Sequence, residues 1–385
     1  MDGSGVVQEE APVLAAGTAT AQDIKRALAA YATPNAKEGV KHFVLDFTLY
    51  GLLIAGVLFL NPLWAKILCS VLAGVKMANL GTLGHDAAHG NLAASRKAND
   101  VMGIALFTPC LYNYRLWQHD HHQLHHIHTN VNHQDSWVPL SKAQYDALPA
   151  WHRALHRAYR SSWGLGFGLY YMIERWMPVR YIPNKGVPKE IRASAWRHLV
   201  YLTTYAAAFI GLLAAAPLYS HTDSVTAVLL GFVLPFYLWL SIFSVTVYVQ
   251  HTHPRMPWFD GPVHRKAMLA QEELASTFLF PHWLTYLMHN VYDHAAHHVN
   301  PRVPFYHLGE ATKTLNEMAG ERAIAEPFSF KRLHQTLKTC KLYDYENYRW
   351  LDFDGNPTTE SQITEAQKHA IRAAGPGSMY VAKAS

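Results

Sequence analysis

Cysteine is scarce in this sequence. The three cysteines, Cys69, Cys110 and Cys340, are far apart and form no CxxC pair. This argues against a disulfide framework and against a zinc or iron–sulfur site built from thiolates. Glu-x-x-His is absent, which disfavours a carboxylate-bridged di-iron bundle, and the lack of His-Glu-x-x-His argues against a membrane zinc protease. Any metal is therefore expected to be bound by other nitrogen and oxygen ligands.

Charged residues are few, at 16% of the 385 residues, while 50% are hydrophobic. The mean hydropathy of -0.06 is too polar for a protein made mostly of membrane spans. The apolar runs are nevertheless too long for an ordinary soluble enzyme. We therefore expect a minority of the chain to lie in the membrane and a large part to lie in water. The net charge of +5 alone says little.

Four apolar stretches are long enough to cross a membrane. The first, FVLDFTLYGLLIAGVLFL at 43–60, has Asp46 as its one charge, and the others fall at about 63–84, 199–217 and 225–250. The last is uncharged and would reach ~39 Å as a helix, which exceeds the hydrocarbon core. The sequence therefore predicts an all-α integral membrane protein with four transmembrane helices in two hairpins and a helical cap in the cytosol.

The basic residues predict how these spans are oriented. The connection 218–224 contains no Lys or Arg, whereas 90–197 and the region after the last span contain many. By the positive-inside tendency, both termini and every histidine cluster should face the cytoplasm, in a bacterial inner membrane or in the endoplasmic reticulum of a eukaryote. Residues 1–42 are expected to be a flexible cytosolic tail without a cleaved signal, 43–308 the membrane domain and 309–385 a cytosolic extension.

Three histidine motifs follow the predicted spans. HDAAH places two imidazoles on one helical face, and HxxHH occurs twice. These motifs contain His85 and His89, then His122, His125 and His126, and finally His294, His297 and His298. Within HDHHQLHHIHTN, a frame that starts at His119 fails because Gln123 would occupy its last position. His119, His121 and His128 are therefore interpreted as surface residues or as neighbours of the metal-binding rings.

Eight imidazoles are too many for one ion, since a catalytic zinc typically takes about three protein ligands. Two ions that share these nitrogens would each have about four or five ligands, and imidazole suits iron, copper and zinc alike. Motif spacing therefore leaves the metal open. Asp86, Asp135 and Asp293 are candidates for orienting the rings, whereas Asp120 is interpreted as a solubilising residue at a helix end.

Four segments together resemble the membrane fatty acid desaturase superfamily, and most of all its omega-6 (delta-12) acyl-lipid branch. They are HDAAH, HQLHHIHTN, VYVQHTHPRMPWF and MHNVYDHAAHHVNPRVPFYHL, in the order that the family uses. The three histidine boxes of that family hold two non-haem irons. The resemblance therefore implies that the eight box histidines are iron ligands in a di-iron site carried by the cytosolic cap.

The resemblance also implies residues outside the boxes. The family uses a histidine at the end of the fourth span as a ligand, and this sequence has His251 at that position. His253 also matches the motif but is not expected to bind iron. Some relatives carry an asparagine one turn earlier, at the position of Val247 here. His289 or Asn290 is the candidate to replace that contact.

The segment after the second box also follows the family. Thr129 and Asn130 continue the box as in the family and independently select the frame that starts at His122. In the following DSWVP segment, Asp135 and Trp137 are candidates for lining the site, and core packing is the alternative role of Trp137.

The resemblance implies an O2-dependent fatty acyl desaturase that uses two iron ions to introduce a C=C bond into a long acyl chain. The substrate would be a fatty acyl lipid or thioester at the bilayer, and no nucleic acid partner is expected. No HPGG motif of a fused cytochrome domain occurs, so electrons should come from a separate ferredoxin or cytochrome b5. A related di-iron hydroxylase, acetylenase, conjugase or alkane monooxygenase stays open as an alternative, because small displacements of the substrate separate these outcomes.

A histidine-rich metal transporter is the alternative from another class. It predicts ionisable residues inside the spans and loosely spaced histidines. The predicted spans are instead nearly free of charge, and the histidines keep strict spacing. The sequence therefore favours the enzyme.

Overall fold

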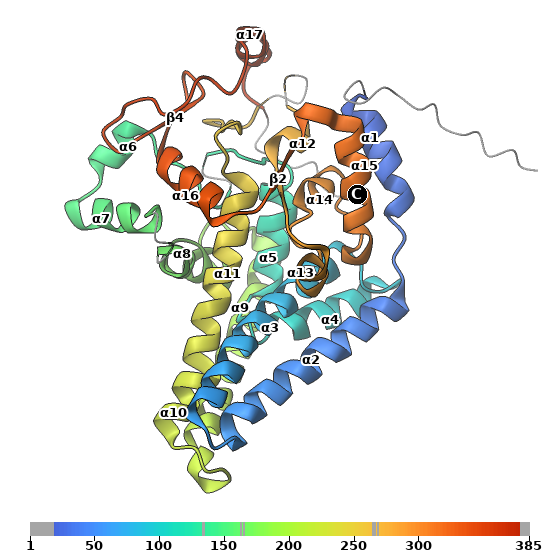
Figure 1. Cartoon of the computed structure of the whole chain (residues 1–385), viewed down its shortest axis with the longest axis vertical. Coiled ribbons are helices and arrows are strands. Elements are labelled where there is room, and N and C mark those ends of the chain that lie inside the picture. Colours follow the sequence, from blue (N-terminus) through green and yellow to red (C-terminus); the bar gives the residue numbers. More distant parts are fainter. Residues whose placement is uncertain are drawn as a thin grey trace, which may run out of the picture.

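The computed structural model describes residues 19–132, 135–161, 164, 166–263, 267 and 269–377. Within these residues the chain is mostly helical, as predicted, and it also contains four short strands that the sequence did not predict. Long helices occupy the lower half of the molecule, and most of the short elements lie above them (Figure 1).

Four helices are long and apolar enough to cross a membrane. They are α2 (Ala36–Phe59), α3 (Leu63–His89), α9 (Lys189–Ala214) and the run Ser224–His251, which comprises α10 (Ser224–Val228), η5 (Leu229–Val233) and α11 (Leu234–His251). These helices coincide with the four predicted spans. However, α2 and α9 begin earlier and α3 ends later than predicted, because polar turns continue each helix beyond its apolar stretch.

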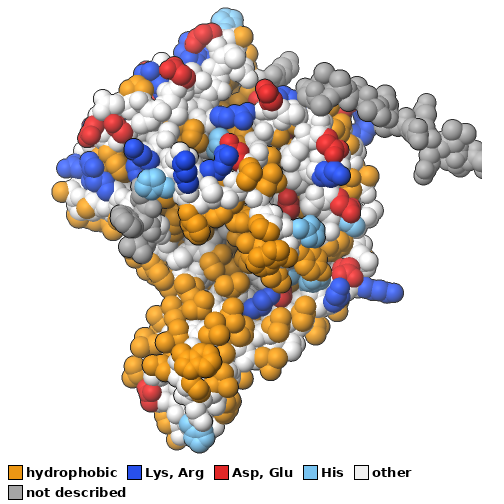
Figure 2. All heavy atoms as spheres, viewed as in Figure 1, with side chains coloured by type: hydrophobic (Ala, Val, Ile, Leu, Met, Phe, Trp, Pro, Cys, Tyr) orange, Lys and Arg blue, Asp and Glu red, His pale blue; other side chains and the backbone are white. Residues whose placement is uncertain are grey.

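Apolar side chains cover the outside of the lower half. Figure 2 shows a broad hydrophobic surface there, with few charged side chains. Leu63, Trp64, Val200 and Val225 are each more than half exposed. Soluble proteins rarely expose so large an apolar surface, so these faces are suited to contact with lipid.

Helix α3 is central to the lower half and packs against α2, α11 and α4 (Arg96–Phe107). Glycines allow this close approach. A side-chain carbon at Gly74 would lie 3.0 Å from the Pro235 carbonyl oxygen, and one at Gly84 would lie 2.4 Å from the ring of Phe107. The packing carries the end of α3, and with it the first histidine motif, up to the short elements.

The short elements nearest the histidines are α5 (Tyr114–Gln118), η2 (His119–His125), α14 (His294–Val299) and α15 (Leu308–Ala319). Strand β1 (Ser276–Leu279) pairs in parallel with β2 (Ile324–Pro327), and β3 (Leu342–Asp344) pairs antiparallel with β4 (Arg349–Leu351). The other elements are α1 (Ala21–Leu28), η1 (Ala29–Tyr31), α6 (Lys142–Ala147), α7 (Ala150–Tyr159), α8 (Gly166–Tyr170), η3 (Tyr171–Tyr181), η4 (Ala216–Leu218), α12 (Gln271–Leu274), α13 (His282–Leu287), η7 (Phe305–His307), η8 (Gly320–Arg322), α16 (Phe330–Thr339) and α17 (Glu365–Ala374).

Parts of both terminal regions are folded against the rest of the described chain. Residues 19–42 form α1, η1 and the first turns of α2, while 1–18 lie outside the described residues. Ile24 and Leu28 of α1 are fully buried in an apolar cluster with α14 and α15, which explains why this segment is folded. At the other end, β2 pairs with β1 across the predicted boundary at 308, so that boundary does not separate two structural units.

Candidate metal centre

The first histidine motif lies at the C-terminal end of α3. His85 and His89 are one turn apart, and their ring centroids are 4.7 Å apart. The helix stops at Gly90, whose φ of 84° lies in the left-handed region that glycine adopts easily. Between the two histidines, Asp86 accepts a hydrogen bond from the backbone N–H of Phe305 at 2.7 Å. This contact joins the first motif to the chain that follows the third.

The second motif lies on η2, a π-helical segment that follows α5. In such a segment the backbone bonds from residue i to i−5, as the N–H of His126 does to the His121 carbonyl at 3.1 Å. Residues five apart therefore point the same way, and the Nε2 atoms of His121 and His126 lie 3.0 Å apart.

The third motif lies on α14, and His251 ends α11 beside it. The Nε2 atoms of His251 and His294 are 2.8 Å apart, and those of His298 and His125 are 3.1 Å apart. The ring nitrogens of histidines that are far apart in the sequence thus lie close together.

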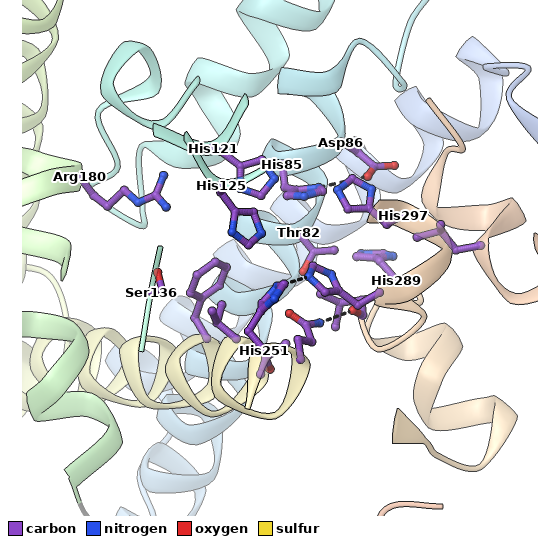
Figure 3. Close-up of a pocket in the computed structure, with 17 residues that line it drawn as sticks. Thr82, His85, Asp86, His121, His125, Ser136, Arg180, His251, His289 and His297 are labelled. Carbon is purple, nitrogen blue, oxygen red and sulfur yellow. Dashed lines mark hydrogen bonds and ion pairs between the residues drawn. The ribbon is translucent and has the colours of Figure 1, made fainter. Parts of the chain in front are cut away.

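The histidines form two adjoining groups. In each group, every residue offers one nitrogen, and these atoms lie within 4.8 Å of one another. The first group contains His85, His89, His121, His126 and His297, and the second contains His125, His251, His294 and His298. The groups adjoin because the rings of His126 and His298 are 4.6 Å apart. Figure 3 shows rings of both groups around one cavity.

Seven of the eight box histidines and His251 belong to these groups. The eighth, His122, stands beside the first group, and its ring lies 4.4 Å from that of His89. The Nε2 atoms of His89 and His122 are both buried and have no hydrogen-bond partner among the described residues. Buried polar atoms normally have a partner, and a bound metal ion would provide one for these ring nitrogens.

His121 has a place in the first group that motif spacing did not assign to it. The ring of Trp117 stacks on it at 4.2 Å and holds it inward. His119 is half-buried and His128 is buried, and both lie outside the two groups. Only the backbone geometry of η2 distinguishes His121 from these two neighbours.

Several imidazoles of the site are held neutral by their surroundings. The pKa lies well below its ordinary value in four of them, mainly because the rings are buried and also because neighbouring imidazoles disfavour a positive charge. These four are His126, His294, His297 and His298. Burial, His85 and Arg96 together lower the pKa of His122 to about 4. A neutral imidazole keeps a lone pair that can bind a cation. The residues therefore fit a pair of cations with nitrogen ligands.

Asp135 fixes the ring of His125. The His125 Nδ1 lies 2.7 Å from Asp135 Oδ1, so the Nδ1–H donates to the carboxylate and leaves Nε2 free for the second group. The backbone N–H groups of Asn130 and Ser136 also donate to this carboxylate. Burial alone would raise the pKa of Asp135, but His125, His251 and the backbone N–H of Asn130 hold it below its usual range.

Replacing Asp135 tests this orienting contact. We expect Asp135→Asn to bind the metal about 10- to 100-fold more weakly, because the neutral amide holds the His125 ring less firmly. The measurement is metal retention by the purified protein against a competing chelator. Asp354→Asn, at an exposed turn, is the matched control and should behave as the wild type. Equal retention by the two variants would contradict the role of Asp135.

Three further candidates take other positions. Asn290 donates its amide to a backbone carbonyl at 2.8 Å. Asp293 lies beside Thr312, and burial raises the pKa of its carboxyl to about 6. Trp137 stacks on Tyr170 at 3.7 Å within an aromatic cluster and is not among the described residues that line the cavity of Figure 3.

A buried ionic network, which the sequence analysis did not predict, lies beneath the site. The Asp46 side chain, only 1% exposed on α2, accepts a hydrogen bond from Lys76 of α3 at 2.7 Å. His289 contacts the other oxygen of Asp46 through Nε2, while its ring lines the cavity. Charged groups inside a membrane span are costly and usually functional.

Two more polar side chains bind the same part of the chain. Asn79 of α3 donates to the Leu287 carbonyl at 2.8 Å, and Gln250 of α11 donates to the Val291 carbonyl at 2.7 Å. The backbone between these carbonyls is unusual, since His289 has a φ of 52°. Three long helices thus hold the turn that leads into the third histidine motif.

The cavity of Figure 3 has two kinds of lining. The imidazoles of His251 and His294 are polar, while Phe243 and Val247 of α11 are apolar and precede His251 at four-residue spacing on the same helix. Its volume of about 50 Å³ suits a short stretch of an apolar chain. Apolar helices that end beside two histidine groups and such a cavity are typical of a membrane protein with a histidine-bound metal site.

Comparison with known proteins agrees with this class. The family model described as "Fatty acid desaturase" matches residues 61–328, and the chain therefore belongs to the fatty acid desaturase family. The family predicted from the histidine motifs is thereby confirmed.

Several curated relatives are similar to the chain. The "Omega-6 fatty acid desaturase, chloroplastic" of Spinacia oleracea is 25% identical over 304 residues, which cover 77% of this chain and 64% of that protein. The "sn-1 oleoyl-lipid 12-desaturase" of Picosynechococcus sp. is 27% identical, with 77% and 81% covered. The "sn-1 acyl-lipid omega-3 desaturase (ferredoxin)" of Synechocystis sp. is 25% identical, with 78% and 82% covered. The chain thus spans less than two thirds of the spinach protein.

Proposed function

We propose that this chain is a membrane-bound fatty acyl desaturase that introduces a C=C bond into a long acyl chain at a di-iron centre. The observation that carries the proposal is the meeting of two histidine groups beside a narrow, partly apolar cavity in a chain of this family. The names of the spinach and Picosynechococcus relatives support omega-6 or delta-12 regiochemistry. The latter name also supports an acyl lipid as the substrate.

The reaction consumes one O2 and two external electrons. Two neighbouring methylenes, O2, two electrons and two protons give one C=C bond and two molecules of water. Bound iron would supply the O2 chemistry. The proposed ligands are the eight box histidines and His251, with His121 as an additional candidate from its position in the first group.

Positioning is the main contribution of the polypeptide. A saturated chain offers no charge to stabilise, so selectivity depends on which carbon atoms lie beside the metal. Phe243 and Val247 would hold the chain there, while Asp135 fixes the ring of His125. The apolar side of the cavity also excludes water from the reacting carbons.

The proposed topology places the four long helices in the bilayer as two hairpins. The short elements then form a cap that carries the site on the cytoplasmic side, together with both termini. This is supported by the lack of Lys and Arg in the connection 218–224 and by the exposed apolar surface of the lower half. The protein would then be an integral membrane protein of a bacterial inner membrane or of the endoplasmic reticulum.

Expression in a host with a known lipid profile tests the proposed activity. We expect a new dienoic fatty acid in the methyl esters analysed by mass spectrometry, with its second double bond at the delta-12 or omega-6 position. Cells that carry the empty vector are the control. Hydroxylated or acetylenic products would assign the chain to a related di-iron enzyme, and unchanged lipids with altered cellular metal content would contradict an enzymatic role.

A further inference from the structure

A second cavity, which we call the basin, lies against the first histidine group. Its volume is about 1430 Å³, and it is open to solvent. Its walls come from η1, α4, α5, η2 and the start of α9, together with the end of α3. His89 and His122 belong to its lining, and the basin shares no described lining residue with the cavity of Figure 3.

Positive charge predominates around the basin. The charged residues of its lining are Lys25, Arg96, Arg115 and Arg302 against Asp100 and Glu190. Asp100 is already paired with Arg115 at 3.3 Å, which leaves the other three basic residues facing one acidic residue. Such a concave basic surface attracts negatively charged partners over a distance and raises their rate of association.

The two cavities suit different partners. The cavity of Figure 3 carries Phe243, Val247 and Val291 and would accept carbon chain. About half of the residues that line the basin carry charged or amide side chains, which would leave an acyl chain in contact with polar groups. It nevertheless reaches His89 and His122, so a water-soluble partner in the basin would reach the first histidine group without entering the cavity of Figure 3.

We propose that the basin is the docking surface of a small acidic electron-carrier protein. The inference rests on the proposed function, because only a metal centre that consumes external electrons needs such a partner. Each C=C bond requires two electrons, so two reduced ferredoxins would dock in turn, and each would lose one electron to the centre. His89 belongs both to the basin lining and to the first histidine group, so the basin reaches that group directly.

Charge reversal at the rim tests the proposal. Lys25 and Arg302 are exposed and lie in the basin, so Lys25→Glu/Arg302→Glu changes its charge at the surface. The matched control is Lys331→Glu/Lys338→Glu, which reverses two exposed charges on α16. Each full-length, iron-loaded protein in nanodiscs is assayed for dienoic product with an acidic plant-type ferredoxin and, separately, with dithionite as the reductant.

We expect the basin variant to lose about tenfold in the ratio of ferredoxin-supported to dithionite-supported turnover at low salt. High salt should reduce the difference, because it screens exposed charges. The control should keep the wild-type ratio. An unchanged ratio in the basin variant, or a raised KM for the lipid with no change for ferredoxin, would overturn the docking proposal. Absence of product from the wild type with both reductants would instead overturn the proposed function.

Discussion

His125→Ala and His297→Ala should each abolish the dienoic product. His125→Ala removes a ring nitrogen from the second histidine group, and His297→Ala removes one from the first group. Each is buried, so the lost ring leaves a gap that solvent does not readily replace as a ligand. Losing a residue that only supports a metal ligand already costs about 10- to 100-fold in metal affinity or activity. Since these variants lose the ligand itself, we expect each to lose at least about 100-fold in activity.

The measurement combines fatty acid analysis with the iron content of the purified variants. His369→Ala is the control, since His369 is exposed on α17 and lies outside both groups. It should retain product and iron at wild-type levels. Full activity in either of the first two variants, or loss of iron in His369→Ala, would contradict the assignment of the groups.

Asp46→Leu should destabilise the protein and reduce its iron content. The substitution leaves Lys76 without its carboxylate partner in the interior, and breaking a buried ion pair in this way typically costs about 3 to 5 kcal/mol. His289 would lose its contact as well, so the turn before the third histidine motif would be held less firmly. Thermal unfolding and iron content in nanodiscs measure the two effects.

The double variant Asp46→Leu/Lys76→Met separates a structural charge pair from general damage to α2. Removing both charges should recover part of the lost stability, because no unpaired charge is then left in the interior. Glu38→Gln on the same helix is the control, since Glu38 pairs with Lys41 at the surface and such pairs contribute little. A double variant that is no more stable than Asp46→Leu would count against the ion pair.

The sequence predicted the long helices well, and the structure brings seven of the eight box histidines together in two groups. Apolar length alone located the four spans, because few other structures bury some twenty apolar residues in a row. The motif spacing located the box histidines, since i, i+3 and i+4 positions share one face of a helix. These signals are local in the chain, which is why they can be read without the fold.

The features that the sequence did not predict depend on contacts between distant segments. His121 enters the first group because η2 is π-helical, and motif spacing assumes an α-helix. Asp46 was noted as one charge in a span, but its partners come from α3 and from the segment after α13. Helix α1 is short and folds because Ile24 and Leu28 pack against α14 and α15, so it carries little signal of its own.

Metal analysis of the wild-type protein tests the central claim most directly. The full chain, purified in detergent from iron-replete cells that make the dienoic product, is assayed by elemental mass spectrometry. Two histidine groups predict two iron ions per chain. A chain that makes the product while carrying a single ion, or zinc in place of iron, would contradict this account.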